Sequence, residues 1–91
     1  MAITVHLPSV LAVHAGGART VEASGRTLGE AVADVAARYP ALGPRLRDTA
    51  GNPYPFVNFY LNDEDVRFRD GFAARVRDGD EVTVIPAIAG G

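Results

Sequence analysis

Few side chains in this sequence could carry out catalytic chemistry by themselves. The chain has two histidines, His6 and His14, two serines, Ser9 and Ser24, and no cysteine. A serine, histidine and acid arrangement would have to be built from one strand and its loop, where nothing positions the three groups. His6 also falls on the polar side of an alternating strand, which is typical of a surface histidine. Without cysteine there is neither a thiolate nucleophile nor a disulfide.

The acidic residues do not form a recognisable metal-binding pattern. The run at residues 63–65 invites a calcium-loop interpretation, but Arg67 stands where a third alternating ligand should be, and no glycine follows at the sharp-turn position. Asp78 and Asp80 flank a glycine and indicate a turn. No glycine-rich loop of the phosphate-binding kind opens the predicted helix. We therefore expect solvated turn carboxylates and no metal site.

The remaining feature with chemical potential is the pair of glycines at the end of the chain, Gly90 and Gly91. Because glycine has no Cβ, an extended Gly-Gly segment can enter a narrow tunnel and present its carboxylate to an active site elsewhere. A carboxylate is a poor electrophile, so it must first be activated, most simply as an acyl adenylate made from ATP. An amine or a sulfur species can then capture the carbonyl carbon. Since the chain lacks cysteine, any sulfur that it carries must be held on that carboxylate as a thiocarboxylate.

Alternating apolar and polar residues predict the strands that must position this tail. Two such segments near the N-terminus form a hairpin with a long apolar loop, and residues 56–61 are a third strand rich in aromatic and β-branched residues. A brief strand at 66–68 follows the acidic turn, and a last strand at 81–85 leads into Pro86. The two N-terminal strands are predicted at residues 3–7 and 19–23.

The most clearly specified helix begins after Thr27 and is ended by Pro40. Thr27 and Glu30 have the spacing of a capping box, in which the hydroxyl accepts a first-turn N–H and the glutamate reaches back. Pro40 lacks the N–H that would continue the hydrogen-bond ladder. A short helical turn is predicted at 44–47, in the proline-rich segment that follows. Apolar residues recur at helical spacing along the main helix and form one stripe, made of Leu28, Ala31, Val32, Val35, Ala36 and Tyr39.

This order of elements predicts an α+β fold in which a mixed sheet of four to five strands packs on one main helix. Parallel pairing of the first and last strands at the middle of the sheet would let the tail leave from its centre. The chain is short enough for one domain, which we place at residues 1–86, with a flexible diglycine tail at 87–91.

Composition excludes several classes of partner. The 9 basic residues, all of them arginine, against 11 acidic residues give a net charge of −2, which makes nucleic acid an unfavourable default partner. No apolar run approaches the roughly 18 residues needed to cross a bilayer. The N-terminal segment lacks a basic region, and His6 and Pro8 interrupt its apolar stretch, so it does not resemble a secretory signal. We therefore expect a cytoplasmic protein that binds neither nucleic acid nor membrane.

The C-terminal half resembles a known family. Residues 78–86 (DGDEVTVIP), followed by the diglycine, resemble the signature of the MoaD/ThiS-type ubiquitin-like sulfur carriers, and the β-grasp order of elements matches along nearly the whole chain. Residues 56–68 and the 87–91 tail are most similar to the CysO-like branch, which serves cysteine biosynthesis. Members of the molybdopterin branch usually have two prolines at the end of the last strand, where this chain has Pro86 followed by Ala87.

The resemblance implies that the chain is a carrier acted on by enzymes, not an enzyme, and that it binds no cofactor itself. An E1-like adenylating enzyme would use ATP and Mg²⁺ to activate the Gly91 carboxylate, which a sulfur donor then converts to a thiocarboxylate. A pyridoxal-phosphate-dependent cysteine synthase would supply the acceptor, and a metalloprotease would release the cysteine formed on the tail. Ala89 and Gly90 would present the end of the tail to these enzymes.

Three other functions stay open on the sequence alone. The small subunit of a molybdopterin synthase would use the same thiocarboxylate but remain in a lasting complex with a large subunit. A ubiquitin-like protein modifier would be joined through Gly91 to lysines of target proteins. An interaction module with an idle tail would use neither reaction.

The strand alternation also predicts where partners dock. Aromatic and aliphatic side chains that point outward on an open sheet suggest a partner patch, and we assign docking to Phe56, Asn58, Tyr60 and Ile85. Thr83 falls on the same face. The opposite set of residues faces the helix, namely Ile3, Val5, Leu7, Val57, Phe59, Leu61, Val82 and Val84.

Overall fold

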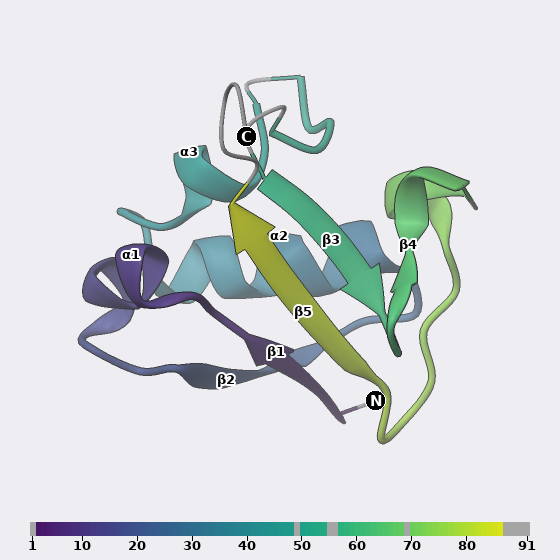
Figure 1. Ribbon diagram of the computed structural model, residues 1–91, viewed down its shortest axis with the longest axis horizontal. Coiled ribbons are helices and arrows are strands. Elements are labelled where there is room, and N and C mark those ends of the chain that lie inside the picture. Colours follow the sequence, from purple (N-terminus) through teal and green to yellow (C-terminus); the bar gives the residue numbers. More distant parts are fainter. Residues whose placement is uncertain (1, 49, 55–56, 69, 87–91) are drawn as a thin grey trace.

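A computed structural model describes residues 2–48, 50–54, 57–68 and 70–86 of the chain. Its centre is a five-stranded sheet in the order β2-β1-β5-β3-β4, with helix α2 crossing one face (Figure 1). The strands are β1 (Ala2–His6), β2 (Thr20–Ser24), β3 (Val57–Leu61), β4 (Glu64–Asp65) and β5 (Glu81–Pro86). The helices are α1 (Ser9–Ala12), α2 (Leu28–Arg38) and α3 (Gly43–Leu46), with 3₁₀ turns η1 (Val13–Ala15), η2 (Val66–Phe68) and η3 (Gly71–Ala73).

Strand β5 lies at the centre of the sheet and joins its two halves. It pairs in parallel with β1, where Val5 lies opposite Val82, and antiparallel with β3, where Phe59 lies opposite Val84. Strand β2 continues the sheet beyond β1, and β4 continues it beyond β3, both antiparallel. The predicted parallel pairing of the first and last strands at the middle of an α+β sheet is therefore confirmed.

Helix α2 begins and ends where the sequence predicts. The Oγ1 atom of Thr27 accepts the backbone N–H of Glu30 at 3.2 Å. The Glu30 carboxylate in turn accepts the N–H of Arg26 at 2.8 Å, one residue earlier than in the usual capping box. At the other end, the Arg38 guanidinium donates to the backbone carbonyl of Glu22 on β2. These contacts hold both ends of the helix.

The two-sided pattern of the strands is confirmed. All residues that the sequence assigns to the helix-facing side are at most 8% exposed. Four residues of the α2 stripe join them in a single core cluster, namely Leu28, Ala31, Val32 and Val35. Full burial of one such aliphatic or aromatic side chain contributes about 1.5–3 kcal/mol, so this face of the sheet supplies much of the stability that holds β5 in place.

The segment at 66–68 corrects one prediction from the sequence. It is the 3₁₀ turn η2 and not a strand, and the short strand β4 precedes it. Asn62 and Asp63 have positive φ angles of 49° and 72°, so the chain reverses in a two-residue hairpin between Leu61 and Glu64. The carboxylate of the next residue, Asp65, accepts the N–H of Arg67 at 2.9 Å. This local hydrogen bond competes with a sheet ladder and favours a turn.

A second difference lies in the connection between β1 and β2. Residues predicted as a long apolar loop form α1 and η1, where the N–H groups of Leu11 and Ala12 both donate to the carbonyl of Pro8. Leu11, Ala12 and Ala15 are buried, so the connection folds inward and extends the core. Gly16, with a φ of 65°, then turns the chain toward β2.

Candidate functional site

The predicted sulfur-carrying tail follows the central strand of the sheet. Strand β5 ends at Pro86, which lies opposite Val57 at the start of β3. Because β5 has a hydrogen-bonded neighbour on each side, the tail has a fixed point of departure. Ala89, Gly90 and Gly91 lie outside the described residues, so their roles and the domain boundary after residue 86 stay predictions.

The structure brings three of the four predicted docking residues together on the open face of the sheet. Asn58 lies directly opposite Ile85 in the β3–β5 register, and Tyr60 lies opposite Thr83 in the next pair on the same face. Ile85 is 41% exposed, while Asn58 and Tyr60 are half-buried. The fourth residue, Phe56, lies outside the described residues. The three described residues form one surface, the open-face patch, near the carboxyl end of β5.

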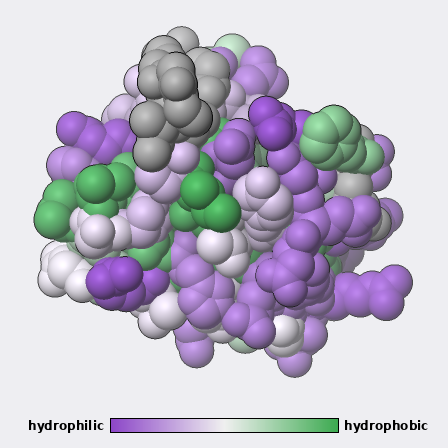
Figure 2. All heavy atoms as spheres, viewed as in Figure 1, coloured by the Kyte–Doolittle hydropathy of each residue, from purple (hydrophilic) through white to green (hydrophobic). Residues whose placement is uncertain are grey.

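The sequence interpretation missed two exposed apolar residues at the same end of the sheet. Val10 in α1 and Val13 in η1 are 62% and 69% exposed. Because β1 runs parallel to β5, the segment after β1 lies at the same edge as the carboxyl end of β5. Figure 2 shows hydrophobic surface over α1 and over this end of β5. The available signal was the apolar run 10–13, since a short helix with one side in the core must expose the other.

The acidic turn after β3 is held by an ion pair. The Arg67 guanidinium reaches the Asp65 carboxylate with an Nη2–Oδ2 distance of 2.7 Å, and its Nε donates to the same oxygen at 3.1 Å. This hydrogen bonding from Arg67 holds the pKa of Asp65 below its ordinary value of 3.8. Within residues 2–48, 50–54, 57–68 and 70–86, no three acidic or histidine side chains lie close enough to hold a metal ion.

His6 pairs with an acidic side chain. Its Nε2 lies 2.6 Å from Oε1 of Glu81 across the parallel β1–β5 pair, and both side chains reach the surface. Ser24 ends β2, where its backbone N–H donates to the Asp34 carboxylate. His6 is therefore a surface residue, as the sequence predicts.

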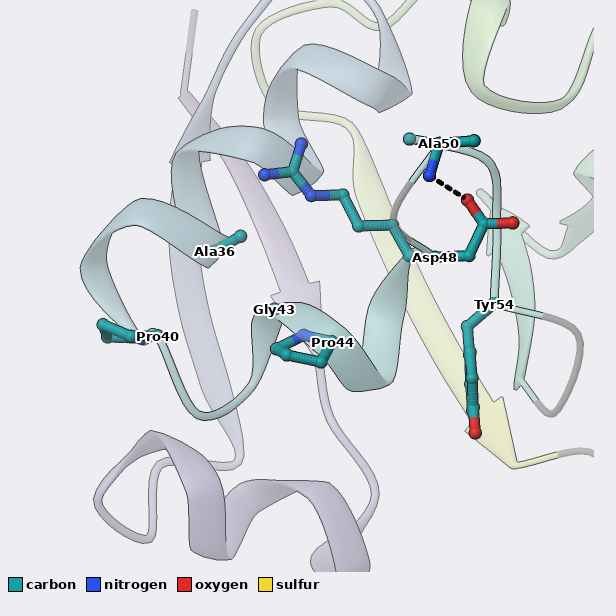
Figure 3. Close-up of a pocket in the computed structure, with 9 residues that line it drawn as sticks. Ala36, Pro40, Gly43, Pro44, Asp48, Ala50 and Tyr54 are labelled. Carbon is teal, nitrogen blue, oxygen red and sulfur yellow. Dashed lines mark hydrogen bonds between the residues drawn. The ribbon is translucent and has the colours of Figure 1, made fainter.

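A groove lies on the helix-covered side, between the end of α2, helix α3 and the loop before β3 (Figure 3). Its volume is about 780 Å³. The loop that forms one of its walls is held by Asp48, whose Oδ1 accepts the N–H groups of Ala50 at 2.9 Å and Asn52 at 3.0 Å. Nothing in the sequence pattern predicts this groove. The residues that line it are Ala36, Pro40, Gly43, Pro44, Arg47, Asp48, Ala50, Gly51 and Tyr54.

A family comparison covers nearly the whole chain. The model of the ThiS family matches residues 5–91, which include the open-face patch, the groove and the tail. The chain belongs to the ThiS family. Among the described residues of this ThiS-family protein, no helix has the length and apolar character needed to span a membrane.

Relatives of this ThiS-family chain include carriers and modifiers. It is 48% identical over 93 residues to the sulfur carrier protein CysO of Mycobacterium tuberculosis strain H37Rv, with 100% of both chains covered. It is 38% identical to small archaeal modifier protein 3 of Haloferax volcanii, with 71% of this chain and 70% of the relative covered. A chain in the crystal structure of the Amycolatopsis orientalis BexX/CysO complex matches with a TM-score of 0.89 and 45% identity, covering 98% of this chain and 99% of that one. The predicted ubiquitin-like β-grasp fold is thereby confirmed.

Proposed function

We propose that this ThiS-family chain is a sulfur carrier whose Gly91 carboxylate is converted to a thiocarboxylate and then gives up its sulfur. The observation that carries the proposal is the match along the whole chain, at 48% identity, to a protein named sulfur carrier protein CysO. The central position of β5 supports it, because the tail then begins at a rigid point. The chain has no cysteine, so sulfur for transfer is best held at the carboxylate.

Activation places a leaving group on the carboxyl carbon. A carboxylate oxygen of Gly91 attacks the α-phosphorus of ATP and pyrophosphate leaves, while Mg²⁺ neutralises phosphate charge. A sulfur donor then attacks the carbonyl carbon, and AMP leaves with the electron pair of the broken C–O bond. We assign these steps to an E1-like adenylating enzyme that takes this chain as its substrate.

We propose that the sulfur is used for cysteine synthesis, since the relative that matches over the full length of both chains is a CysO protein. A pyridoxal-phosphate-dependent cysteine synthase would supply the acceptor from phosphoserine, and the thiocarboxylate sulfur would add to it. An S-to-N acyl shift would leave cysteine joined to Gly91 through an amide. A metalloprotease would hydrolyse that amide, which releases cysteine and restores the carboxylate. ATP, Mg²⁺ and pyridoxal phosphate are assigned to these partners.

The open-face patch is the proposed docking surface for the partner enzymes. Tyr60 and Ile85 give it aromatic and aliphatic surface, and Val10 and Val13 add exposed apolar surface at the same end of the sheet. An exposed apolar surface among polar side chains is typical of a protein-binding site. Docking there would hold the tail within reach of an active site, so that the chain carries the sulfur and the partners catalyse its transfer.

A second candidate function is favoured by the 38% identity to small archaeal modifier protein 3. In this case Gly91 would be joined to lysine amines of other proteins. The activation step is the same, but an amine captures the acyl adenylate in place of a sulfur species. Dependence of the product on sulfide separates the two functions.

ATP–pyrophosphate exchange with the adenylating enzyme of the same organism tests the activation step. The wild-type chain should support exchange, and a chain that lacks Gly91 should not. Thermal unfolding of the two chains should be the same, because the deletion lies beyond the last strand. Gly90→Ala should slow exchange without unfolding the protein, since the added Cβ obstructs a narrow tunnel. Exchange that continues without Gly91 would contradict the proposal.

A further inference from the structure

The groove beside α3 is built mainly from small and apolar residues. Ala36 and Gly43 contribute buried surface, Pro40 and Pro44 lie on its helical side, and Tyr54 lies across from them (Figure 3). The two helices approach closely here, because a Cβ added at Gly43 would lie 3.1 Å from the Cβ of Ala36. The groove therefore depends on small residues at the α2–α3 contact.

One cation lies at this groove. Arg47 is half-buried, whereas the seven other arginines that the structure describes are exposed. Within the described part of the chain, its guanidinium has no hydrogen bond or ion pair. The adjacent Asp48 forms no ion pair with it, and the Oδ1 atom of that carboxylate instead accepts the N–H groups of Ala50 and Asn52. A half-buried arginine side chain without a partner can still pair its charged end with an anion, so the groove favours an occupant that brings a carboxylate.

The groove also lies near Pro86, the last residue of β5, after which the tail begins. The N–H of Val57 donates to the carbonyl of Tyr54 at 3.2 Å, and Val57 lies opposite Pro86 at the end of β5. Five residues, 87–91, follow, and a chain of that length can span at most about 17 Å at about 3.3 Å per residue. An enzyme that holds the Gly91 carboxylate in its active site must therefore come close to this end of the molecule.

We propose that the groove is a second contact for the adenylating enzyme and that it receives a surface segment with an apolar side chain next to an aspartate or glutamate. The apolar side chain would lie against Pro40, Pro44 and Tyr54, and the carboxylate would pair with Arg47. Local charge supports this choice of partner, since residues 43–54, which form α3 and the loop beside the groove, contain two arginines and one aspartate in a chain of net charge −2. This contact presupposes the proposed function. The enzyme would then bind both sides of the sheet, at the open-face patch and at the groove on the helix-covered side.

Charge reversal at Arg47 tests the contact in the ATP–pyrophosphate exchange reaction. Arg47→Glu should raise the KM for the carrier about tenfold with little change in kcat, because the tail itself is untouched. Arg77→Glu is the matched control, since Arg77 is exposed and precedes the opposite end of β5. It makes the same change in net charge and should leave KM as in the wild type. Arg47→Gln, which removes the charge without reversing it, should give a smaller rise.

The possible results distinguish a failure of the groove contact from a failure of the sulfur-carrier function. Equal KM values for Arg47→Glu and Arg77→Glu would overturn the contact and leave the sulfur-carrier function standing, provided that exchange still needs Gly91. A lower KM for Arg47→Glu would also overturn it, and would mean that the groove holds the chain's own tail until a partner arrives. Failure of the wild-type chain to support any exchange would refute the proposed function itself. Thermal unfolding of each variant should match the wild type, so that a KM effect reports binding.

Discussion

Truncation of Val82 measures how much of the fold depends on the central strand. Val82 is fully buried on β5, between Val5 on β1 and Leu61 on β3. Val82→Ala removes two methyl groups, which is about 1.6 kcal/mol of transfer free energy at about 0.8 kcal/mol per group. Strands on both sides prevent the cavity from closing, which adds to the loss. We expect the free energy of unfolding to fall by about 2–3 kcal/mol and Tm to fall by about 10–20 °C.

Ile85, on the same strand, supplies the control. Ile85→Ala removes more atoms, but this side chain is 41% exposed on the open face, so we expect a loss of about 1 kcal/mol or less. Urea denaturation followed by circular dichroism would give both free energies of unfolding, with m values close to that of the wild type. A loss at Ile85 that equals or exceeds the loss at Val82 would refute the two-sided assignment of β5, and with it the open-face patch.

Three further substitutions test other parts of the structure. Tyr60→Ala should weaken binding of the adenylating enzyme more than it lowers stability, because Tyr60 is half-buried on the open face; the reverse order, measured by titration calorimetry and denaturation, would place Tyr60 in the core. Thr27→Ala removes the cap on the Glu30 N–H and should lower the free energy of unfolding by about 1 kcal/mol; an unchanged urea midpoint would contradict this role. Asp65→Asn should reduce the amount by which Tm falls as the pH is lowered into the acidic range. Because Arg67 holds the folded pKa of Asp65 below 3.8, the ion pair stabilises the fold above that pH and is lost as the pH falls through the folded pKa. Parallel curves of Tm against pH for the two proteins would contradict this assignment.

The sheet and the main helix could be predicted because local sequence and tertiary structure agree there. Residues on β3 and β5 alternate between the two faces of the sheet, and one set is buried in the structure, namely Val57, Phe59, Leu61, Val82 and Val84. Helix α2 has a cap at Thr27, a stop at Pro40 and one apolar stripe, so its period and its limits are specified together. The central position of β5 is one of the few arrangements that a hairpin, a crossover helix and a returning strand allow, and the pairing of β5 with β1 and β3 shows that the chain adopts it.

The errors arise where a local hydrogen bond or a distant contact decides the structure. Valine and phenylalanine at 66 and 68 favour a strand by propensity, but the Asp65 side chain captures the Arg67 N–H and makes a turn. The connection between β1 and β2 becomes helical because Leu11 reaches the core, which no periodicity over so short a segment indicates.

The candidate site could be predicted in part. Alternation along β3 and β5 placed Asn58, Tyr60 and Ile85 on one face, and the register then brought them together. The groove could not be predicted, because it depends on how α2 packs against α3. Arg47 and Tyr54 line one groove only through that packing, and the groove lies near the end of β5 only because Val57, which is hydrogen-bonded to Tyr54, pairs with Pro86.

An intact-mass spectrum of the chain tests the thiocarboxylate most directly. The purified protein would be incubated with its adenylating enzyme, ATP and sulfide, and each component would be omitted in turn. We expect a mass increase equal to the exchange of one oxygen for one sulfur, seen only with all components present and absent from a chain that lacks Gly91. An unchanged mass under every condition, or ATP-dependent attachment to larger proteins regardless of sulfide, would contradict the sulfur-carrier function.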